Sequence, residues 1–452
     1  MSGNRANGIA SPPPPPENQN KTVEVYFGVF FDGTLNHLEQ ASIGERYRKK
    51  VVSGLSSKAA EKELNEELEK EGNDKKYTGS DAQENDRSNV ALLFQYFNEK
   101  SKDYVCRLYL EGIGTEEDGG ESLLGKALGK GGTGIKAKVK KAIEKIPEKI
   151  NEKLANLEDE DINIKLYFEL FGFSRGAAAA RNFVWNVIAK STAALTKELK
   201  PMKLIFVGIN YVGLFDTVSA HGLNLFSDSD VADLHLNAIS KAKYVFHICA
   251  ADEFRKNFAL TNIYSAKVAG KGEEIFIPGA HSDIGGGYAA GEYTVILDMD
   301  LFPDKTVDDI HTVVTKDSLE RLGWIRDTDI PFKNYEIYPK QSRYGDRIKF
   351  TNIIQKGYSF IGLELMAEDA RSNRTNMFSS IRQQYTTPIQ LQEIKELANG
   401  STSLEICQQK FVDHYKSLNL RKYWLHFSSN DAKIGMGPRR KNGILKRNII
   451  DG

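Results

Sequence analysis

A serine lies between two glycines in the segment Gly172-Phe173-Ser174-Arg175-Gly176, after a β-forming run and before a run of alanines. Between a strand and a helix, the pattern G-x-S-x-G forms a nucleophile elbow, whose strained turn lifts the serine hydroxyl above a sheet. Side chains at the two outer positions would collide with the turn, so Gly172 and Gly176 fit this geometry. We therefore predict Ser174 as a nucleophile, with Gly172 and Gly176 as the elbow glycines.

A serine nucleophile needs a base that accepts its proton and an acid that orients the base. Downstream, an apolar run ends at Asp216 in GLFDTVSA, and a second run reaches a turn at His281 in IPGAHSDIGGGY. Open α/β sheets gather their reactive groups beyond the carboxyl ends of the strands. The spacing predicts His281 as the base and Asp216 as the acid.

Other histidines compete for the role of base. His426, in YWLHFSSN, also follows a strand-like stretch and is the rival base, although His281 has the glycine-rich turn beside it. His221 follows Asp216 closely and is expected to border the site. His247 lies in a stretch that we interpret as a helix, where a satisfied core histidine is expected. His37 precedes the serine, which is the wrong order for this triad.

The oxygen of an attacked ester carbonyl gains negative charge and needs hydrogen-bond donors. We expect one donor to be the backbone N–H of Arg175 and the other to be that of Gly33 or Thr34, in the turn after the first strand. Asp32 and Asp283 are further carboxylates near the predicted site. We interpret both as turn-capping residues, with a shared cation as the alternative, and the chemistry itself needs neither a metal nor a cofactor.

Alternating strands and helices must position these groups. The pattern predicts strands at 22–31, 104–110, 162–171, 203–207 and 274–277, and helices at 89–97 and 176–190. Such alternation favours parallel crossovers, and hence an α/β fold with a mostly parallel sheet and helices on both faces. Apolar residues at helical spacing between 135 and 157 predict an amphipathic helix, kinked or split at Pro147.

The chain divides into three parts by composition. Residues 1–20 carry five consecutive prolines and are expected to form a disordered arm. Residues 21–300 are predicted to form the catalytic core, with a charged, partly helical insertion at 41–86 and a candidate lid at 112–160. Residues 301–452 are expected to be an extension that packs on this core, and they carry no motif to which we assign chemistry.

Composition excludes several classes of protein. The 452 residues contain 61 Lys+Arg and 61 Asp+Glu, and this balance argues against a nucleic-acid binder driven by phosphate charge. With 40% hydrophobic residues, the chain is not generally disordered. No run approaches the length of a membrane span, and the first residues lack the apolar region of a signal peptide. Three dispersed cysteines predict neither a disulfide framework nor a cysteine-based zinc site.

Two further motifs are incomplete. The stretch from Gly120 to Lys126 has the spacing of a phosphate-binding loop, but Ala127 stands where a Ser or Thr must bind magnesium. The segment FFDGT resembles the strand-end motif of haloacid-dehalogenase-like phosphatases, but Phe30 occupies the position of the nucleophilic aspartate. We reject the ATPase and keep the phosphatase as a minor alternative.

Four segments in this order resemble one known family: VFFDGTLN, GFSRGAAAARNF, GLFDTVSAHG and IPGAHSDIGGGY. Weaker similarity is found in DRSNVALLF, EGIGT and ADEFRKNF. Together they resemble the α/β-hydrolase domain family that includes the antibacterial phospholipase effectors of type VI secretion systems, over roughly residues 22–290.

This resemblance implies an α/β-hydrolase core that cleaves acyl esters of membrane glycerophospholipids, with a triad at Ser174, Asp216 and His281. It implies a cognate immunity protein and a secretion-spike component as partners, with no nucleic acid. The expected location is the producer's cytoplasm, then the periplasm or membrane of a target cell after type VI export. The alternatives are a carboxylesterase for non-membrane esters and a non-catalytic delivery or binding module on a hydrolase scaffold.

Overall fold

A computed structural model describes most of the chain, in the ranges 21–113, 131–157, 162–190, 192–197, 199, 202–219, 229–299, 314–325, 334–338, 346–373, 377–433, 436–441, 444–445 and 447–452. The predicted N-terminal arm, His221 and the phosphate-loop-like stretch lie outside these residues, as does most of the glycine-rich part of the candidate lid.

A six-stranded parallel sheet forms the centre of the molecule, in the order β2-β1-β3-β4-β5-β7. Its strands are β1 (Lys21–Phe31), β2 (Val105–Leu110), β3 (Ile162–Phe173), β4 (Lys203–Phe215), β5 (Val245–Ala250) and β7 (Gly272–Ile277). The predicted α/β fold with a parallel sheet is confirmed. The helix predicted around His247 is wrong, because these residues form the fully buried strand β5.

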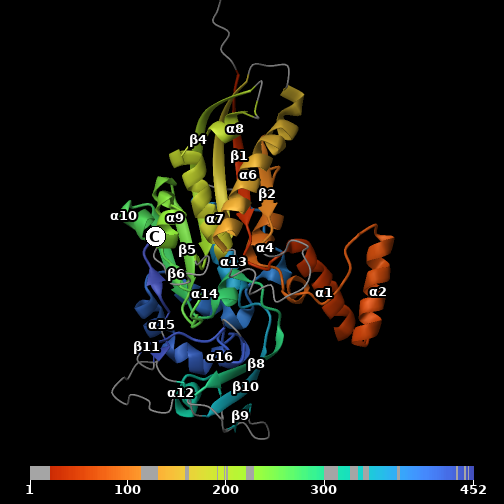
Figure 1. The fold of residues 1–452 in the computed structure, drawn as a ribbon, viewed down its shortest axis with the longest axis vertical. Helices are drawn as coiled ribbons and strands as arrows, with labels where there is room; N and C mark the ends of the chain where they lie inside the picture. The colour runs from red at the N-terminus through yellow and green to blue at the C-terminus, as the bar shows by residue number, and fades with distance from the viewer. Residues whose placement is uncertain are drawn as a thin grey trace, which may run out of the picture.

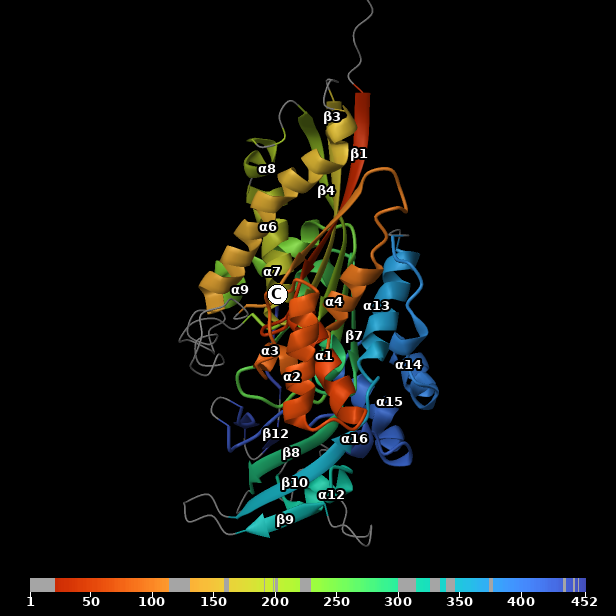
Figure 2. The ribbon, with the colours of Figure 1, turned by 90° about the vertical axis from the view of Figure 1, so that its right-hand side faces the viewer.

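Helices cover both faces of the sheet, as Figure 2 shows with the sheet seen from the side. On one face lie α6 (Gly131–Leu154), α7 (Arg175–Val184) and α8 (Ala193–Lys197), and on the other lie α4 (Asn89–Tyr96), α13 (Phe360–Ser372) and α14 (Gln392–Ala398). Alternate residues of β1 separate the two cores, since Phe31 packs with α6 and α7 while Phe30 packs with α4. A π-helical turn, Trp185–Lys190, extends α7.

Helix α6 is continuous through Pro147, and its apolar stripe is buried against the sheet. Ile135, Ile146 and Ile150 are all 0% exposed. The split at Pro147 is therefore wrong. The helical part of the candidate lid packs on the sheet, and the lid itself stays a prediction.

The charged insertion is a helical hairpin that projects from the core in Figure 1. It consists of α1 (Leu38–Val52), α2 (Ser57–Lys70) and the short α3 (Asp81–Glu84). Its small apolar core is made of Ile43, Leu64 and Leu68. Ion pairs such as Arg46–Glu67 and Lys50–Glu63 join α1 to α2 and account for the charge runs in the sequence.

The chain after β7 returns to the core through several small elements. A three-stranded antiparallel sheet is formed by β8 (Gly291–Asp298), β10 (Arg347–Ile354) and β9 (Tyr335–Tyr338), and lies at one end of the molecule in Figure 1. The other elements after β7 are α11 (His281–Gly285), α12 (Lys316–Arg321), α15 (Leu404–Ser417), α16 (Leu420–Tyr423), β11 (Arg440–Lys441) and β12 (Ile444–Leu445), with 3-10 turns at Gln383–Tyr385 and Ile389–Leu391. Small elements before β7 are α9 (Ser229–Asp233) and α10 (Tyr264–Val268), with 3-10 turns at Ala155–Leu157 and Leu236–Lys241. The last strand, β13 (Ile449–Ile450), pairs in parallel with β6 (Leu260–Thr261). Among the described helices, none combines the length and apolarity needed to cross a bilayer.

Candidate active site

Ser174 occupies the sharp turn between β3 and α7, with φ 58° and ψ −125°. A non-glycine residue is strained in this region, as a nucleophile elbow requires. A Cβ on Gly172 would lie 2.6 Å from the Cα of Ala177, and one on Gly176 would lie 2.2 Å from the carbonyl oxygen of Phe31. Only glycine fits at both positions.

The backbone ties the serine turn directly to the turn that carries Asp216. The Ser174 N–H donates to the carbonyl oxygen of Phe215 at 3.0 Å, and the Val218 N–H donates to the carbonyl oxygen of Ser174 at 3.3 Å. Asp216 itself follows β4 in a left-handed conformation, with φ 43°. Since β3 and β4 are neighbours in the sheet, their carboxyl ends bring the hydroxyl and the carboxylate to one edge.

His281 begins α11, just after β7, and its Nδ1 lies 2.5 Å from Oδ2 of Asp216. Both residues are buried, and the imidazole lies between the rings of Phe173 and Phe258, with centroid distances of 4.6 and 5.1 Å. Burial lowers the pKa of His281 below its ordinary value, despite the opposing effect of Asp216. The imidazole is therefore neutral at pH 7, with Nδ1 donating to Asp216 and Nε2 able to accept a proton.

Ser174 and His281 line the same cavity, which has a volume of about 260 Å³. Its wall also contains apolar side chains, among them Leu35, Val218 and Met436. Among the described residues no hydrogen bond joins the Ser174 hydroxyl to His281. Such bonds are often long in enzymes without substrate and tighten when it binds.

The two predicted sources of the second oxyanion donor differ in the structure. The Gly33 N–H already donates to Oδ1 of Asp32 at 2.7 Å, so Gly33 is not available as a donor. Thr34 lines the cavity, and its Oγ1 accepts a hydrogen bond from Nε of Arg175 at 2.7 Å. The remaining candidates are thus the backbone N–H groups of Arg175 and Thr34. Burial lowers the pKa of the Arg175 side chain to about 10, which leaves it cationic at neutral pH.

Asp32 and Asp283 both serve as hydrogen-bond acceptors for protein groups. Asp32 accepts from Ser88 at 2.7 Å and from Tyr109 at 2.5 Å, in addition to Gly33, and burial raises its pKa to about 6. Asp283 accepts from the Ala280 N–H at 2.9 Å and caps the turn before His281. These contacts are the ones expected of turn-capping carboxylates. The shared cation gains no support, because protein groups contact both oxygens of each carboxylate.

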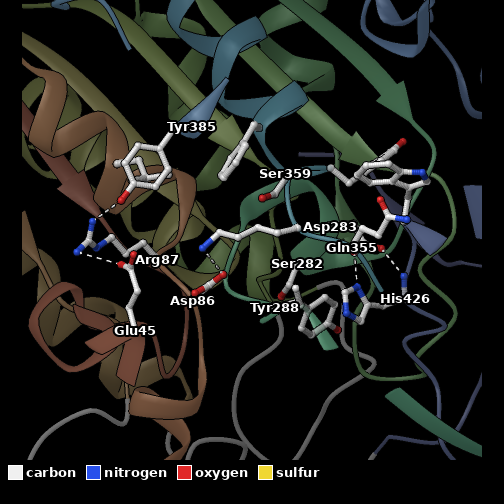
Figure 3. Close-up of a pocket in the computed structure, with 17 residues that line it drawn as sticks. Glu45, Asp86, Arg87, Ser282, Asp283, Tyr288, Gln355, Ser359, Tyr385 and His426 are labelled. Carbon is white, nitrogen blue, oxygen red and sulfur yellow. Dashed lines mark hydrogen bonds and ion pairs between the residues drawn. The ribbon is translucent and has the colours of Figure 1, made fainter. Parts of the chain in front are cut away.

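His426, the rival base, lies in a neighbouring and smaller cavity, shown in Figure 3. Its Nδ1 is 2.6 Å from Oδ1 of Asp283, and its ring packs on Tyr288 and Tyr293. Ser174 does not belong to the wall of this cavity. His426 therefore forms a second His–Asp pair that is separate from the serine.

One buried group in the described part of the chain has the spacing of metal ligands, namely His247, Cys249 and Glu274. His247 accepts from the Thr217 N–H at 3.1 Å through Nε2, and its Nδ1 lies 2.9 Å from Glu274. Both ring nitrogens are thus engaged inside the protein. We interpret His247 as a core histidine that supports the turn after Asp216.

Arg447, five residues before Gly452, is a site residue that no sequence pattern singles out. Its guanidinium contacts both carboxylate oxygens of Asp216, at 2.6 Å to Oδ1 and 2.7 Å to Oδ2. No motif surrounds this arginine, so only the folded structure brings it to the site.

Comparison with known proteins gives one family match within the chain. Residues 189–301 match the family model described as the type VI secretion phospholipase effector Tle1-like, catalytic domain. These residues are therefore similar to a Tle1-like catalytic domain. The matched segment contains Asp216 and His281, and Ser174 precedes it.

One solved structure agrees with the fold of this chain. The chain is similar to the Tle1 effector bound to the VgrG spike from the type 6 secretion system, with a TM-score of 0.57 and 22% identity, over 98% of this chain and 99% of that one. A second structure, an uncharacterized protein from Pseudomonas aeruginosa, has a TM-score of 0.39 and 16% identity, over 86% of this chain and 53% of that one. No curated protein matches the sequence.

Proposed function

We propose that this Tle1-like chain is a serine-dependent phospholipase A, in which Ser174, His281 and Asp216 act as a catalytic triad. The observation that carries the proposal is the convergence of an elbow serine and a buried His–Asp pair on one cavity. The family match supports hydrolysis of phospholipids by this domain. The alcohol nucleophile, the base and the acid then come from β3, β7 and β4.

In this mechanism the Ser174 hydroxyl oxygen attacks the ester carbonyl carbon while Nε2 of His281 takes its proton. Asp216 stabilises the imidazolium that forms, and the N–H groups of Arg175 and Thr34 stabilise the oxyanion. The protonated His281 gives its proton to the leaving glycerol oxygen, and the acyl group stays on Ser174. A water molecule, deprotonated by His281, then attacks the acyl-enzyme and releases the fatty acid.

The lining of the cavity favours a phospholipid over an uncharged ester as the substrate. Its apolar side chains can contact an acyl chain, while Arg175 and Lys433 contribute positive charge; Arg255 also lines the wall, but its charge is balanced by Glu253. No carboxylate belongs to the described lining of this cavity. An anionic phosphodiester close to the scissile ester complements such a wall electrostatically.

The proposed route of secretion rests on the similar solved structure. The similar Tle1 effector is bound to a VgrG spike, and we propose that this chain likewise travels on a type VI secretion spike. Its site of action is then the membrane of a target cell, and the producer needs an immunity protein that blocks the enzyme. Co-purification with the spike protein of the same system tests the first partner.

The enzymatic proposal is tested with phospholipid vesicles. The wild type is expected to release fatty acid and lysophospholipid, and Ser174→Ala is expected to lose at least about a thousandfold of this activity. Ser359→Ala is the matched control, because Ser359 also precedes a helix but lies on the wall of the other cavity. Turnover of short soluble esters without vesicle hydrolysis would instead indicate a carboxylesterase, and an inert, folded wild type would indicate a non-catalytic module.

A further inference from the structure

We infer that Arg447 is a positioning residue for Asp216, so that the C-terminal tail of the chain completes the catalytic centre. The inference rests on the proposed triad and extends it to a residue that has no place in the serine, acid and histidine pattern. It makes residues 447–452, which follow all the large elements of the fold, a working part of the site.

The contacts of Arg447 form a clamp on the carboxylate. Its two terminal nitrogens reach the two oxygens of Asp216 at 2.6 and 2.7 Å, and the two side chains are 2% and 0% exposed. The same guanidinium donates to the carbonyl oxygens of Ala250 at 3.0 Å and Phe258 at 3.1 Å. A planar guanidinium that is itself held by backbone carbonyl oxygens fixes the plane of the carboxylate that it binds with two hydrogen bonds.

Asp216 shares its oxygens between this clamp and the imidazole. Oδ1 also accepts from the Ala250 N–H at 2.9 Å, and Oδ2 faces Nδ1 of His281 at 2.5 Å. The arginine therefore determines which lone pair of Oδ2 points to His281. A shift of about 1 Å in a catalytic group can lower the rate roughly a hundredfold.

The tail that carries Arg447 is itself anchored by backbone hydrogen bonds. The Leu260 N–H donates to the carbonyl oxygen of Asn448 at 2.8 Å, and the Ser265 N–H donates to that of Gly452 at 2.9 Å. On the other side of β6, the Thr261 N–H donates to the carbonyl oxygen of Thr217 at 2.9 Å. The tail, β6 and the turn of Asp216 thus form one hydrogen-bonded stack.

The positive charge of Arg447 has a second consequence for the base. Oδ2 of Asp216 lies beside the imidazole of His281, and Oε2 of Glu253 accepts from the backbone N–H of His281 at 3.2 Å. A guanidinium balances each carboxylate, Arg447 for Asp216 and Arg255 for Glu253. The other titratable groups on the cavity wall are Arg175, Tyr288, Tyr293 and Lys433. Removing Arg447 leaves the Asp216 charge less compensated and favours the imidazolium form. The acid limb of kcat/KM, which is its decline at low pH, then moves to higher pH.

Two substitutions separate these roles. Arg447→Met removes both the fork and the charge while keeping a long side chain, and Arg447→Lys keeps the charge but loses the bidentate grip. Arg421→Met is the matched control, because Arg421 forms a buried ion pair with Asp252 at 2.7 Å and does not line the catalytic cavity. Each variant is measured for thermal unfolding and for kcat/KM on a fluorogenic phospholipid across pH 4–9.

For Arg447→Met we expect kcat/KM to fall about a hundredfold and its acid limb to rise by roughly one pH unit. Arg447→Lys should keep the wild-type acid limb with an intermediate kcat/KM, and Arg421→Met should lower the unfolding temperature without moving the limb. An Arg447→Met enzyme with wild-type kcat/KM and acid limb overturns the inference, and so does an equal shift in Arg421→Met. If Arg447→Met does not fold, an acid limb in Arg447→Lys that moves up overturns the role of the charge.

The proposed function fails in a different way. In that case the wild type does not hydrolyse the phospholipid, or Ser174→Ala hydrolyses it equally well. The behaviour of Arg447 variants is interpreted only after wild type and Ser174→Ala have been shown to differ.

Discussion

Two buried histidines pair with aspartates in this molecule, and their pair geometries are nearly the same. Nδ1 of His281 lies 2.5 Å from Asp216, and Nδ1 of His426 lies 2.6 Å from Asp283. The two pairs differ in what surrounds them. His281 shares a cavity of about 260 Å³ with Ser174, whereas the cavity beside His426 holds about 30 Å³, room for about one water molecule.

The second pair has a structural task that its contacts explain. Asp283 accepts from the backbone N–H groups of Ala280 and His426, at 2.9 and 3.0 Å, so it joins the turn before His281 to the C-terminal part of the chain. The comparison teaches that a His–Asp pair does not define a catalytic site. The nucleophile and the space for a substrate decide which pair does chemistry.

The largest difference in activity is expected between variants of the two histidines. His281→Ala should lower kcat/KM for phospholipid hydrolysis by about 10⁴-fold, because no other base accepts the Ser174 proton. His426→Ala should lower it less than about tenfold, since His426 acts on the site only indirectly, through the turn of Ala280 and through Tyr288 and Tyr293, on which its ring packs. Steady-state kinetics on vesicles give both numbers, and the reverse order would assign the base to His426.

The two aspartates sharpen the same comparison. Asp216→Asn should reduce kcat/KM by about 10³-fold, and should also destabilise the fold by about 3 kcal/mol, because buried Arg447 loses its charged partner. Asp283→Asn should cost only about 1–2 kcal/mol of the free energy of unfolding, the cost of weakened hydrogen bonds. Urea unfolding and kinetics measure the two effects separately. Equal losses of activity in both variants contradict the division of roles.

The pH dependence tests the state of His281. Burial places its pKa below the ordinary value of about 6.5. The neutral imidazole is the active form, so kcat/KM should stay on its plateau as the pH falls through 6.5 and decline only below the lowered pKa. A pH profile at constant ionic strength measures this limb. An apparent pKa above 6.5 argues against a buried, neutral base.

The smallest effect is expected from the charges of the two cavities. Lys433 lines the catalytic cavity, which has no carboxylate in its described wall, while Lys356 lines the other cavity and pairs with Asp86 at 2.9 Å. Lys433→Met should lower hydrolysis of anionic vesicles about threefold relative to a neutral short-chain ester, as expected for one partly screened charge. Lys356→Met should leave that ratio unchanged. An equal change in both variants removes the electrostatic argument for the substrate.

Much of the core could be predicted because local patterns determine it. The parallel α/β arrangement followed from runs of β-branched and aromatic residues alternating with helices. The conformation of Ser174 followed from two glycines that have no room for a side chain. At Asp216 and His281, strand-ending positions indicated where reactive groups gather, and the structure brings these two side chains into contact.

The rest depends on contacts between distant segments. Strand β5 was interpreted as a helix because a fully buried strand shows no alternation, and the whole of Val245–Ala250 is buried. Gly33 is a predicted oxyanion donor whose N–H donates to the neighbouring Asp32 instead, a contact that a sequence pattern cannot reveal. Arg447 reaches Asp216 across 231 residues of sequence, and no local signal marks it.

Labelling with a fluorophosphonate tests the central claim most directly, since the reagent is attacked only by an activated serine. Mass spectrometry of the labelled, digested protein should locate the adduct on Ser174, with the labelling rate about 10³-fold lower in His281→Ala and within about tenfold of wild type in His426→Ala. An adduct on another serine, or labelling that depends on His426 and not on His281, would contradict the account.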